Sequence, residues 1–253
     1  MDISPRTLIR LTTLVVWFAA LPTHALAAGA DSEPSALSFS GELDLVSRYV
    51  WRTITYSDGP VLQPSVGFSA GPAEFGVWAN AGPSGTGSAH HVDEVDYSAA
   101  WSFDLGLVEA KPSVVLYTYP GNADAGTGEL QVELRRGVPG GLSAFVRHAT
   151  DVFDYPGASF TAAGVDREWD FAGLGTLSLS TQVGRGSQPF SDAYLPGGPA
   201  LTVIGAAASW SIPLGRGWGV RPHVDWLEVV EDEARALLPA HTPFTIGVAL
   251  GRL

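Results

Sequence analysis

The sequence predicts an antiparallel transmembrane β-barrel of about twelve strands, with short periplasmic turns and longer extracellular loops. The first observation is the stretch at residues 37–52, LSFSGELDLVSRYVWR, in which apolar or aromatic residues alternate with positions that include two acids and two arginines. Side chains on a strand alternate between its faces, so one face here is apolar and the other is charged. Sixteen residues are long for a globular strand and suit a membrane strand that continues beyond the lipid.

The second observation is that the connections between the expected strands alternate in length. Short turns are expected near residues 71–72, 107–110, 138–141, 172–175 and 215–217. Longer loops are expected near residues 53–60, 82–92, 120–128, 151–157, 186–199 and 228–242. This sorting of loops is typical of bacterial outer-membrane barrels, which have an even number of strands. A soluble β-sandwich or a lipocalin-like barrel shares the alternating strands but has no reason to sort its loops, and residues 142–186 allow more than one division into strands.

The N-terminal residues predict export. Arg6 and Arg10 precede an apolar run at residues 11–21, and Ala25 and Ala27 provide the small residues of a signal-peptidase site. We therefore expect a cleaved signal peptide at residues 1–27, a short periplasmic lead at 28–36 and an outer-membrane barrel at 37–253. An uncleaved membrane anchor is the alternative, although the apolar run is short for one.

Composition excludes several classes of function. After cleavage the chain keeps 25 acidic and 12 basic residues, a balance that argues against nucleic acid as a partner. The absence of cysteine excludes disulfides, thiolate metal sites and a lipoprotein anchor. No mature stretch offers about 18 uninterrupted apolar residues, so no transmembrane helix is expected. The expected partners are outer-membrane lipid, the barrel assembly machinery, and small solutes or ions.

The polar phase of the expected strands provides candidates for the residues that line a pore. They are Glu42, Asp44, Arg48, Arg52, Asp96, Asp104, Glu129, Gln131, Glu133, Arg135, Arg147, Arg221, His223 and Asp225. A buried charge is costly without a partner, so these groups must pair across the lumen or lie in water. A fully paired network predicts a non-conducting structural or surface-interaction barrel. Separated charges in water predict a passive channel for small solutes or ions, and the acidic outer loops favour cations or neutral solutes.

The apolar phase is expected to face lipid, with Leu43 and Phe103 as examples. Aromatic residues on this phase suit the girdles at the two membrane interfaces, although they would also suit the core of a soluble barrel. The girdle candidates are Tyr49, Trp51, Tyr97, Trp101, Trp218 and Trp226.

Catalytic and metal chemistry have weak signals. A membrane-embedded hydrolase would need a nucleophile beside a histidine that acts as a general base. His223, oriented by the carboxylate of Asp225, is the candidate for such a base. However, no G-x-S-x-G motif occurs that would provide the nucleophile. The stretch HHVDE at residues 90–94 could bind a divalent metal, but it reads more simply as a polar loop. The acidic residues Glu228, Glu231, Asp232 and Glu233 lack the spacing of a calcium loop and suit a solvated rim. We expect no enzyme activity and no cofactor.

One motif indicates a family. LVSRYVWR at residues 45–52, followed by SDGPVLQPS at residues 57–65, resembles the opening of the TorF-like family of small outer-membrane porins, which reads L-V-S-x-Y-x-x-R-G and then S-D/N-G-x-P-x-x-Q. The matching residues are Leu45, Val46, Ser47, Tyr49, Arg52, Ser57, Asp58, Gly59, Pro60 and Gln63. The resemblance covers about twenty residues and implies a channel. Two departures are Thr53, where the family commonly has glycine, and the C-terminal Leu253, where many barrels end in an aromatic residue.

Overall fold

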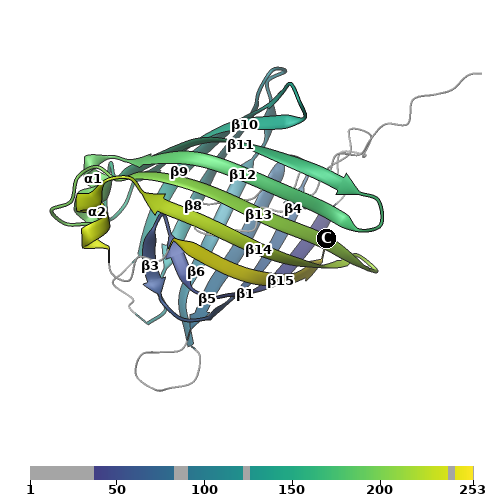
Figure 1. Ribbon diagram of the computed structural model, residues 1–253, viewed down its shortest axis with the longest axis horizontal. Coiled ribbons are helices and arrows are strands. Elements are labelled where there is room, and N and C mark those ends of the chain that lie inside the picture. Colours follow the sequence, from purple (N-terminus) through teal and green to yellow (C-terminus); the bar gives the residue numbers. More distant parts are fainter. Residues whose placement is uncertain (1–36, 83–90, 122–125, 239–242, 253) are drawn as a thin grey trace, which may run out of the picture.

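A computed structural model describes residues 37–82, 91–121, 126–238 and 243–252, which form one closed antiparallel barrel (Figure 1). The expected signal peptide, the periplasmic lead, His90 and Leu253 lie outside the described residues. Within the described ranges, no helix is long and apolar enough to span a membrane.

The wall of the barrel has twelve strand positions. β1 pairs with β4 on one side and with β15 on the other, which brings the two ends of the chain together. β7 continues β6 beyond Ser102, and both pair with β8, so they share one position. The wall strands are β1 Leu37–Val46, β4 Val61–Ala70, β5 Ala73–Gly82, β6 His91–Trp101, β7 Phe103–Asp104, β8 Glu109–Thr118, β9 Gly126–Val138, β10 Leu142–Asp151, β11 Ser159–Phe171, β12 Gly175–Gly186, β13 Thr202–Gly215, β14 Trp218–Val229 and β15 Phe244–Arg252.

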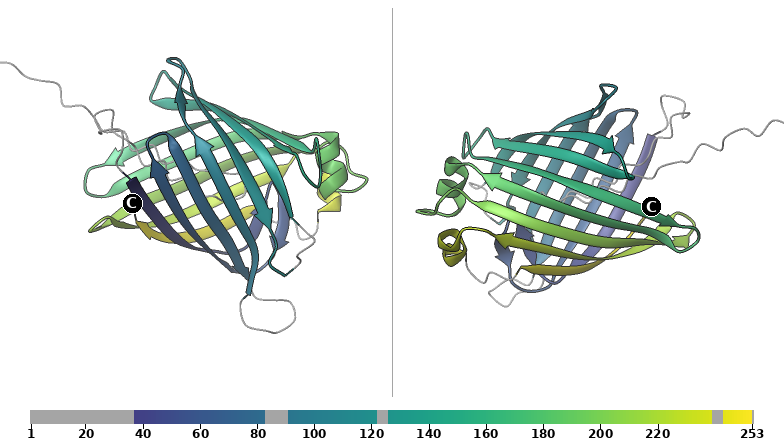
Figure 2. Two further views of the ribbon diagram at one scale, coloured as in Figure 1. Left: turned by 180° about the vertical axis from the view of Figure 1, so that it is seen from behind. Right: turned by 45° about the horizontal axis from the view of Figure 1, so that its top comes forward.

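The connections sort by length as predicted, and the fold class is confirmed. Tight turns follow β4, β7, β9, β11 and β13, at the rim where β1 begins and β15 ends. The longer connections lie at the opposite, extracellular rim. They include a hairpin of β2 (Tyr49–Trp51) and β3 (Ile54–Ser57) and two short helices, α1 (Gln188–Tyr194) and α2 (Asp232–Leu237). Both helices lie at the end of the barrel away from the C-terminus (Figure 2).

The two faces of the wall are inverted relative to a soluble barrel. On β1 the outward residues Phe39 and Leu45 are 65% and 57% exposed, whereas the inward Glu42 is 9% exposed. Most outward positions around the barrel repeat this apolar exposure, and inward positions are mostly polar, charged or small. Apolar side chains on the outer face gain no stabilisation in water, but they are favourable in contact with lipid hydrocarbon. This is the arrangement of a membrane barrel.

The aromatic prediction is confirmed in part. Tyr97, Trp101 and Trp218 lie on the outer face and are about half exposed, and Trp226 lies on the same face and is half-buried. Tyr49 and Trp51 were expected on that face, but they are buried inside the barrel at 4% and 5% exposure. Those two assignments are wrong.

The reason is that the first strand ends at Val46 and not at Arg52. The chain then forms the β2–β3 hairpin, whose turn places Arg52 and Thr53 at φ values of 49° and 74°. Two consecutive positive φ values suit a tight two-residue hairpin turn, in which Asn and Gly are the usual residues. The hairpin has two faces of its own, so the two-residue alternation continues through residues 49–51 although they have left the wall.

Leu43→Arg should impair insertion, because Leu43 lies on the outer face in the interior of β1. We expect a loss of about 2–4 kcal/mol in the free energy of unfolding from bilayers if the site lies near the midplane. Urea titration of protein folded into lipid vesicles measures this loss. Leu37→Arg, at the rim of the same strand face, is the matched control and should cost about 0–1 kcal/mol. Equal behaviour of the two variants would contradict the assigned outer face.

Thr53→Gly should stabilise the hairpin. Thr53 is a β-branched residue at positive φ, and its hydroxyl is buried without a hydrogen-bond partner among the described residues. Glycine removes both costs, and we expect a gain of about 1 kcal/mol in urea unfolding. Thr55→Gly, within β3, is the control and should lower stability by about 0.5–1 kcal/mol. A loss at Thr53 of the same size would show that its backbone is unstrained.

Candidate functional site

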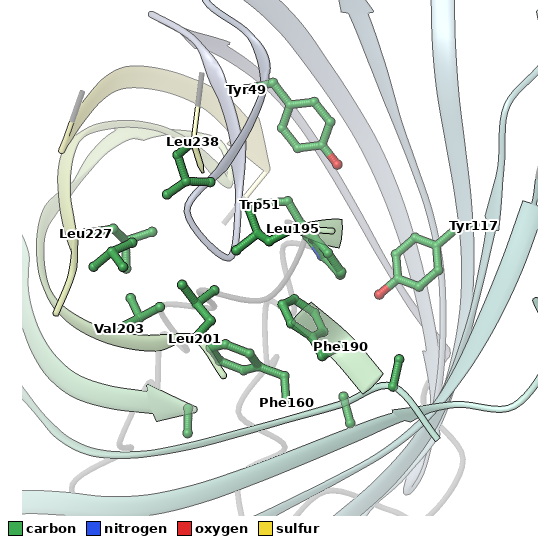
Figure 3. Packing of buried hydrophobic residues seen from close by; sticks show 14 of the residues in the cluster. Tyr49, Trp51, Tyr117, Phe160, Phe190, Leu195, Leu201, Val203, Leu227 and Leu238 are labelled. Atoms are coloured by element: carbon green, nitrogen blue, oxygen red, sulfur yellow. The ribbon is translucent and has the colours of Figure 1, made fainter. Parts of the chain in front are cut away.

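An apolar cluster lies inside the extracellular mouth of the barrel, and we call it the mouth cluster. It is built from the β2–β3 hairpin, helix α1 and inward residues of the upper wall (Figure 3). The ring of Trp51 lies 5.7 Å from that of Phe190 and 5.0 Å from that of Tyr194 on α1, and 6.3 Å from that of Tyr117 on β8. The main members are Tyr49, Trp51, Tyr117, Phe160, Phe190, Tyr194, Leu195, Leu201, Val203, Leu227 and Leu238.

Helix α1 has the local signals that fix it against this cluster. Ser187 is the N-cap, and its hydroxyl accepts a hydrogen bond of 3.2 Å from the Phe190 N–H. Pro189 follows in the first turn, where the missing N–H of proline costs no hydrogen bond within the helix. Ser191 is fully buried and its hydroxyl accepts from the Leu201 N–H at 3.2 Å, which ties the helix to the start of β13. Phe190, at 1% exposure, therefore points into the barrel.

Arg52, at the tip of the hairpin, crosses the lumen to Glu129 on β9. Its two terminal nitrogens donate to the two carboxylate oxygens at 2.7 and 2.8 Å, and the side chains are 1% and 3% exposed. β9 is five wall positions from β1, almost diametrically opposite in a twelve-stranded barrel. Tyr117 and Gln131 also donate to Glu129, each at 2.9 Å. The Arg52 guanidinium lies 4.2 Å from the centre of the Trp51 ring, so the ion pair and the mouth cluster are one structure.

The tyrosines at the mouth remain neutral. Burial raises the pKa of Tyr56 on β3 well above its ordinary value, and the nearby negative charge of Glu94 adds to the effect. Burial likewise raises the pKa of Tyr194 on α1. Both hydroxyls therefore stay protonated at any physiological pH, and the two rings add no charge to the mouth.

Below the mouth, the charged residues pair along the wall. Arg135 on β9 contacts Asp166 on β11 at 2.6 Å and Glu133 at 3.1 Å, and Arg147 on β10 also contacts Glu133. The Phe145 ring lies beside this group, 4.2 Å from the Arg147 guanidinium. The two residues of each pair lie on the same strand or on strands that are one or two positions apart in the wall.

A second group lies on the opposite wall and has the same character. Arg221 on β14 contacts Glu42 on β1 at 2.7 Å. His223 contacts Asp44 and Asp225, each at 3.0 Å, through different ring nitrogens. Both nitrogens thus face carboxylates, and neither is placed to accept a proton from a serine. This geometry gives no support to a hydrolase.

Two pore candidates lie elsewhere than expected. Asp104 is exposed at the end of β7, at the tight-turn rim, where it accepts a hydrogen bond of 2.7 Å from the Gly106 N–H. Arg48 lies between β1 and the hairpin and pairs at 3.1 Å with Asp58, which is 59% exposed. The remaining candidates lie on the inward face of the wall, except Arg52 at the hairpin tip.

The sequence did not single out several residues that face the lumen. Lys111 on β8 pairs with Glu74 on β5 at 2.7 Å, and Glu94, Asp166 and Trp78 also lie on the inner face. The alternation of β5, β6 and β11 contained this signal. Inward acids outnumber inward bases in the described chain. The acids include Glu42, Asp44, Glu74, Glu94, Asp96, Glu129, Glu133, Asp151, Asp166, Glu168 and Asp225, and the bases include Arg52, Lys111, Arg135, Arg147 and Arg221, besides His223.

The metal hypotheses gain no support from the described residues. Within them, no group of three or more His, Asp or Glu side chains could hold a metal ion; His90 and the side chain of His91 lie outside that description. At the acidic rim, Arg235 contacts Glu228 at 2.8 Å and Asp232 at 2.6 Å, and Glu231 accepts from the Thr202 N–H. These acids hold α2 and the ends of β13 and β14 together.

Comparison with known proteins places the fold. No protein-family model and no curated protein matches the chain. Among solved structures it is similar to the KdgM porin, with a TM-score of 0.52 and 12% identity, and to the NanC porin, with a TM-score of 0.51 and 9% identity. A KdgM porin in complex with disordered oligogalacturonate gives a TM-score of 0.54 and 10% identity. Each comparison covers 85% of this chain and 98% of the other. Identities this low show the fold alone, a small barrel of the outer-membrane porin type.

Removing either partner of the Arg52–Glu129 pair should destabilise the barrel strongly. Arg52→Met or Glu129→Gln leaves the other group buried, and we expect a loss of about 3–5 kcal/mol in urea unfolding. The double variant should lose less than the sum of the two, because it leaves no unpaired charge.

Arg48→Met is the matched control in the same connection. Its partner Asp58 is largely exposed, so the loss should be about 0–1 kcal/mol. Additive losses in the Arg52 and Glu129 double variant would mean that the two side chains do not interact.

Proposed function

We propose that the chain is an outer-membrane channel for passive diffusion of small solutes or ions, with a hairpin across its extracellular mouth. The observation that carries the proposal is that the ion pairs below the mouth run along the wall of the barrel and not across its lumen. Below the mouth, the named pairs join wall strands at most two positions apart, so they line the lumen without bridging it. Such a lining suits a water-filled path. The small-porin fold and the apolar outer face support the same function.

The excess of inward acids gives the proposed channel a preference. A lumen with more carboxylates than cations lowers the free energy of a permeating cation and raises that of an anion. Oligogalacturonate, found with the KdgM porin, is a polyanion, and the acidic lumen of this chain does not favour such a solute. We propose cations or neutral solutes instead.

The second candidate is a non-conducting structural or surface-interaction barrel. Its specific support is the mouth cluster together with the Arg52–Glu129 pair, which cross the lumen at one level. On either function, the protein lies in outer-membrane lipid after export, signal-peptide cleavage and insertion by the barrel assembly machinery. The TorF-like resemblance remains an expectation that rests on the residues of β1 and the hairpin.

Single-channel recording in planar bilayers tests the proposal. The refolded chain of residues 28–253 should give discrete, reproducible current steps with a cation permeability above that of anions. Arg52→Gln should increase the fraction of time that the channel conducts, because it removes the link across the mouth. Arg48→Gln is the control, since its ion pair does not cross the lumen.

The outcomes separate the two candidates. A folded barrel that stays silent in both the wild type and Arg52→Gln would favour the structural candidate. Current with clear anion preference would refute the proposed role of the inward acids.

A further inference from the structure

Asp96 on β6 is a buried carboxylate that the described residues leave without a donor. It is 0% exposed, and neither carboxylate oxygen has a hydrogen-bond partner in the described chain. Its cross-strand neighbours are Trp78 on β5 and Tyr117 on β8, which are 1% and 5% exposed. Residues directly opposite on adjacent strands share a face, so Asp96 lies between two aromatic residues on the lumenal wall. An ionised carboxylate in this setting is costly unless a cation accompanies it.

Glu94 lies two residues from Asp96 on the same face of β6, at the level of the mouth. It is 4% exposed and accepts hydrogen bonds from the hydroxyls of Tyr49 and Tyr119. Phenol donors stabilise a carboxylate but do not cancel its charge. Two residues along a strand advance the chain by roughly 7 Å, so a single cationic group between the two carboxylates would lie close to both.

The surroundings of Arg52 show that a cationic group can be bound in this part of the barrel. Its guanidinium is bound by Glu129 and lies against the rings of Trp51, Phe160 and Phe190, at 4.2, 5.1 and 5.6 Å from their centres. Glu129 is close enough to Asp96 to interact with it electrostatically. Three carboxyl groups and one guanidinium therefore share this region among aromatic side chains.

From this arrangement we propose that Asp96 and Glu94 form a binding site for the primary ammonium or guanidinium group of an organic cation. Such a group has several N–H donors, enough for both Asp96 oxygens and for Glu94, and the faces of Trp78 and Tyr117 favour a cation beside them. No three-ligand metal group occurs among the described residues, so an organic cation suits the site better than a divalent metal. The inference rests on the proposed channel function and specifies the class of solute.

Isothermal titration calorimetry of the folded, detergent-solubilised full chain with agmatine tests the site. Agmatine has one ammonium and one guanidinium group. We expect saturable binding, weakened at least about tenfold by Asp96→Asn, which keeps the shape of the side chain and removes its charge. Glu233→Gln, on the exposed face of α2 at the same rim, removes one charge outside the site and should leave the affinity unchanged.

Glu94→Gln provides a second variant if Asp96→Asn does not fold, as judged by heat-dependent mobility in gels, and it should also weaken binding. No binding by the wild type at millimolar agmatine would overturn the site, and so would equal affinity in all folded variants. Binding without conductance in bilayers would refute the channel and leave the site standing. Conductance without binding would refute the site alone.

Discussion

The arrangement of the mouth depends on one interaction, the ion pair that joins Arg52 to Glu129 across the lumen. Both groups are almost fully buried, and a buried charge is stable only with its partner in place. This requirement holds the hairpin across the opening, and the hairpin in turn offers Trp51 as the surface on which α1 packs. The chain leaves the wall at the end of β1, at Val46, and β1 is five strand positions from β9, which carries Glu129. The mouth cluster therefore requires the hairpin to cross the barrel.

The lower lumen differs, because its charged side chains form ion pairs with neighbours on the wall. Space for these side chains comes from small residues beside them. A Cβ at Gly247 would lie 2.2 Å from Nε2 of His223, and a Cβ at Gly164 would lie 2.6 Å from the Phe145 ring. His223 and Phe145 can thus lie flat along the wall instead of projecting towards the axis. One barrel therefore combines a crossed upper level with a lower level whose polar groups are held at the periphery.

The alternation of residues determined most of the wall but not the mouth. Side-chain phase correctly placed Glu42, Glu133 and Arg147 on the inner face, and loop lengths correctly gave twelve strands and the two rims. Phase failed at Trp51, because a hairpin alternates as a strand does and its turn at Arg52 and Thr53 lacks the usual glycine. The row of Trp78, Asp96 and Tyr117 depends on the register of three strands, which no single segment encodes.

The stretch that resembles the TorF-like motif includes the same hairpin. Tyr49 stacks on Tyr56 at 5.3 Å, Ser57 bonds the backbone of Gly59, and Gln63 donates to Asn80 at 3.1 Å. The motif thus covers the hairpin together with the adjoining ends of the wall strands β1 and β4. Movement of the hairpin away from the wall would withdraw the one guanidinium from Glu129 and leave that carboxylate beside Asp96 and Glu94. The open mouth would then have one more uncompensated negative charge than the closed one, so opening itself would strengthen the attraction for a cation.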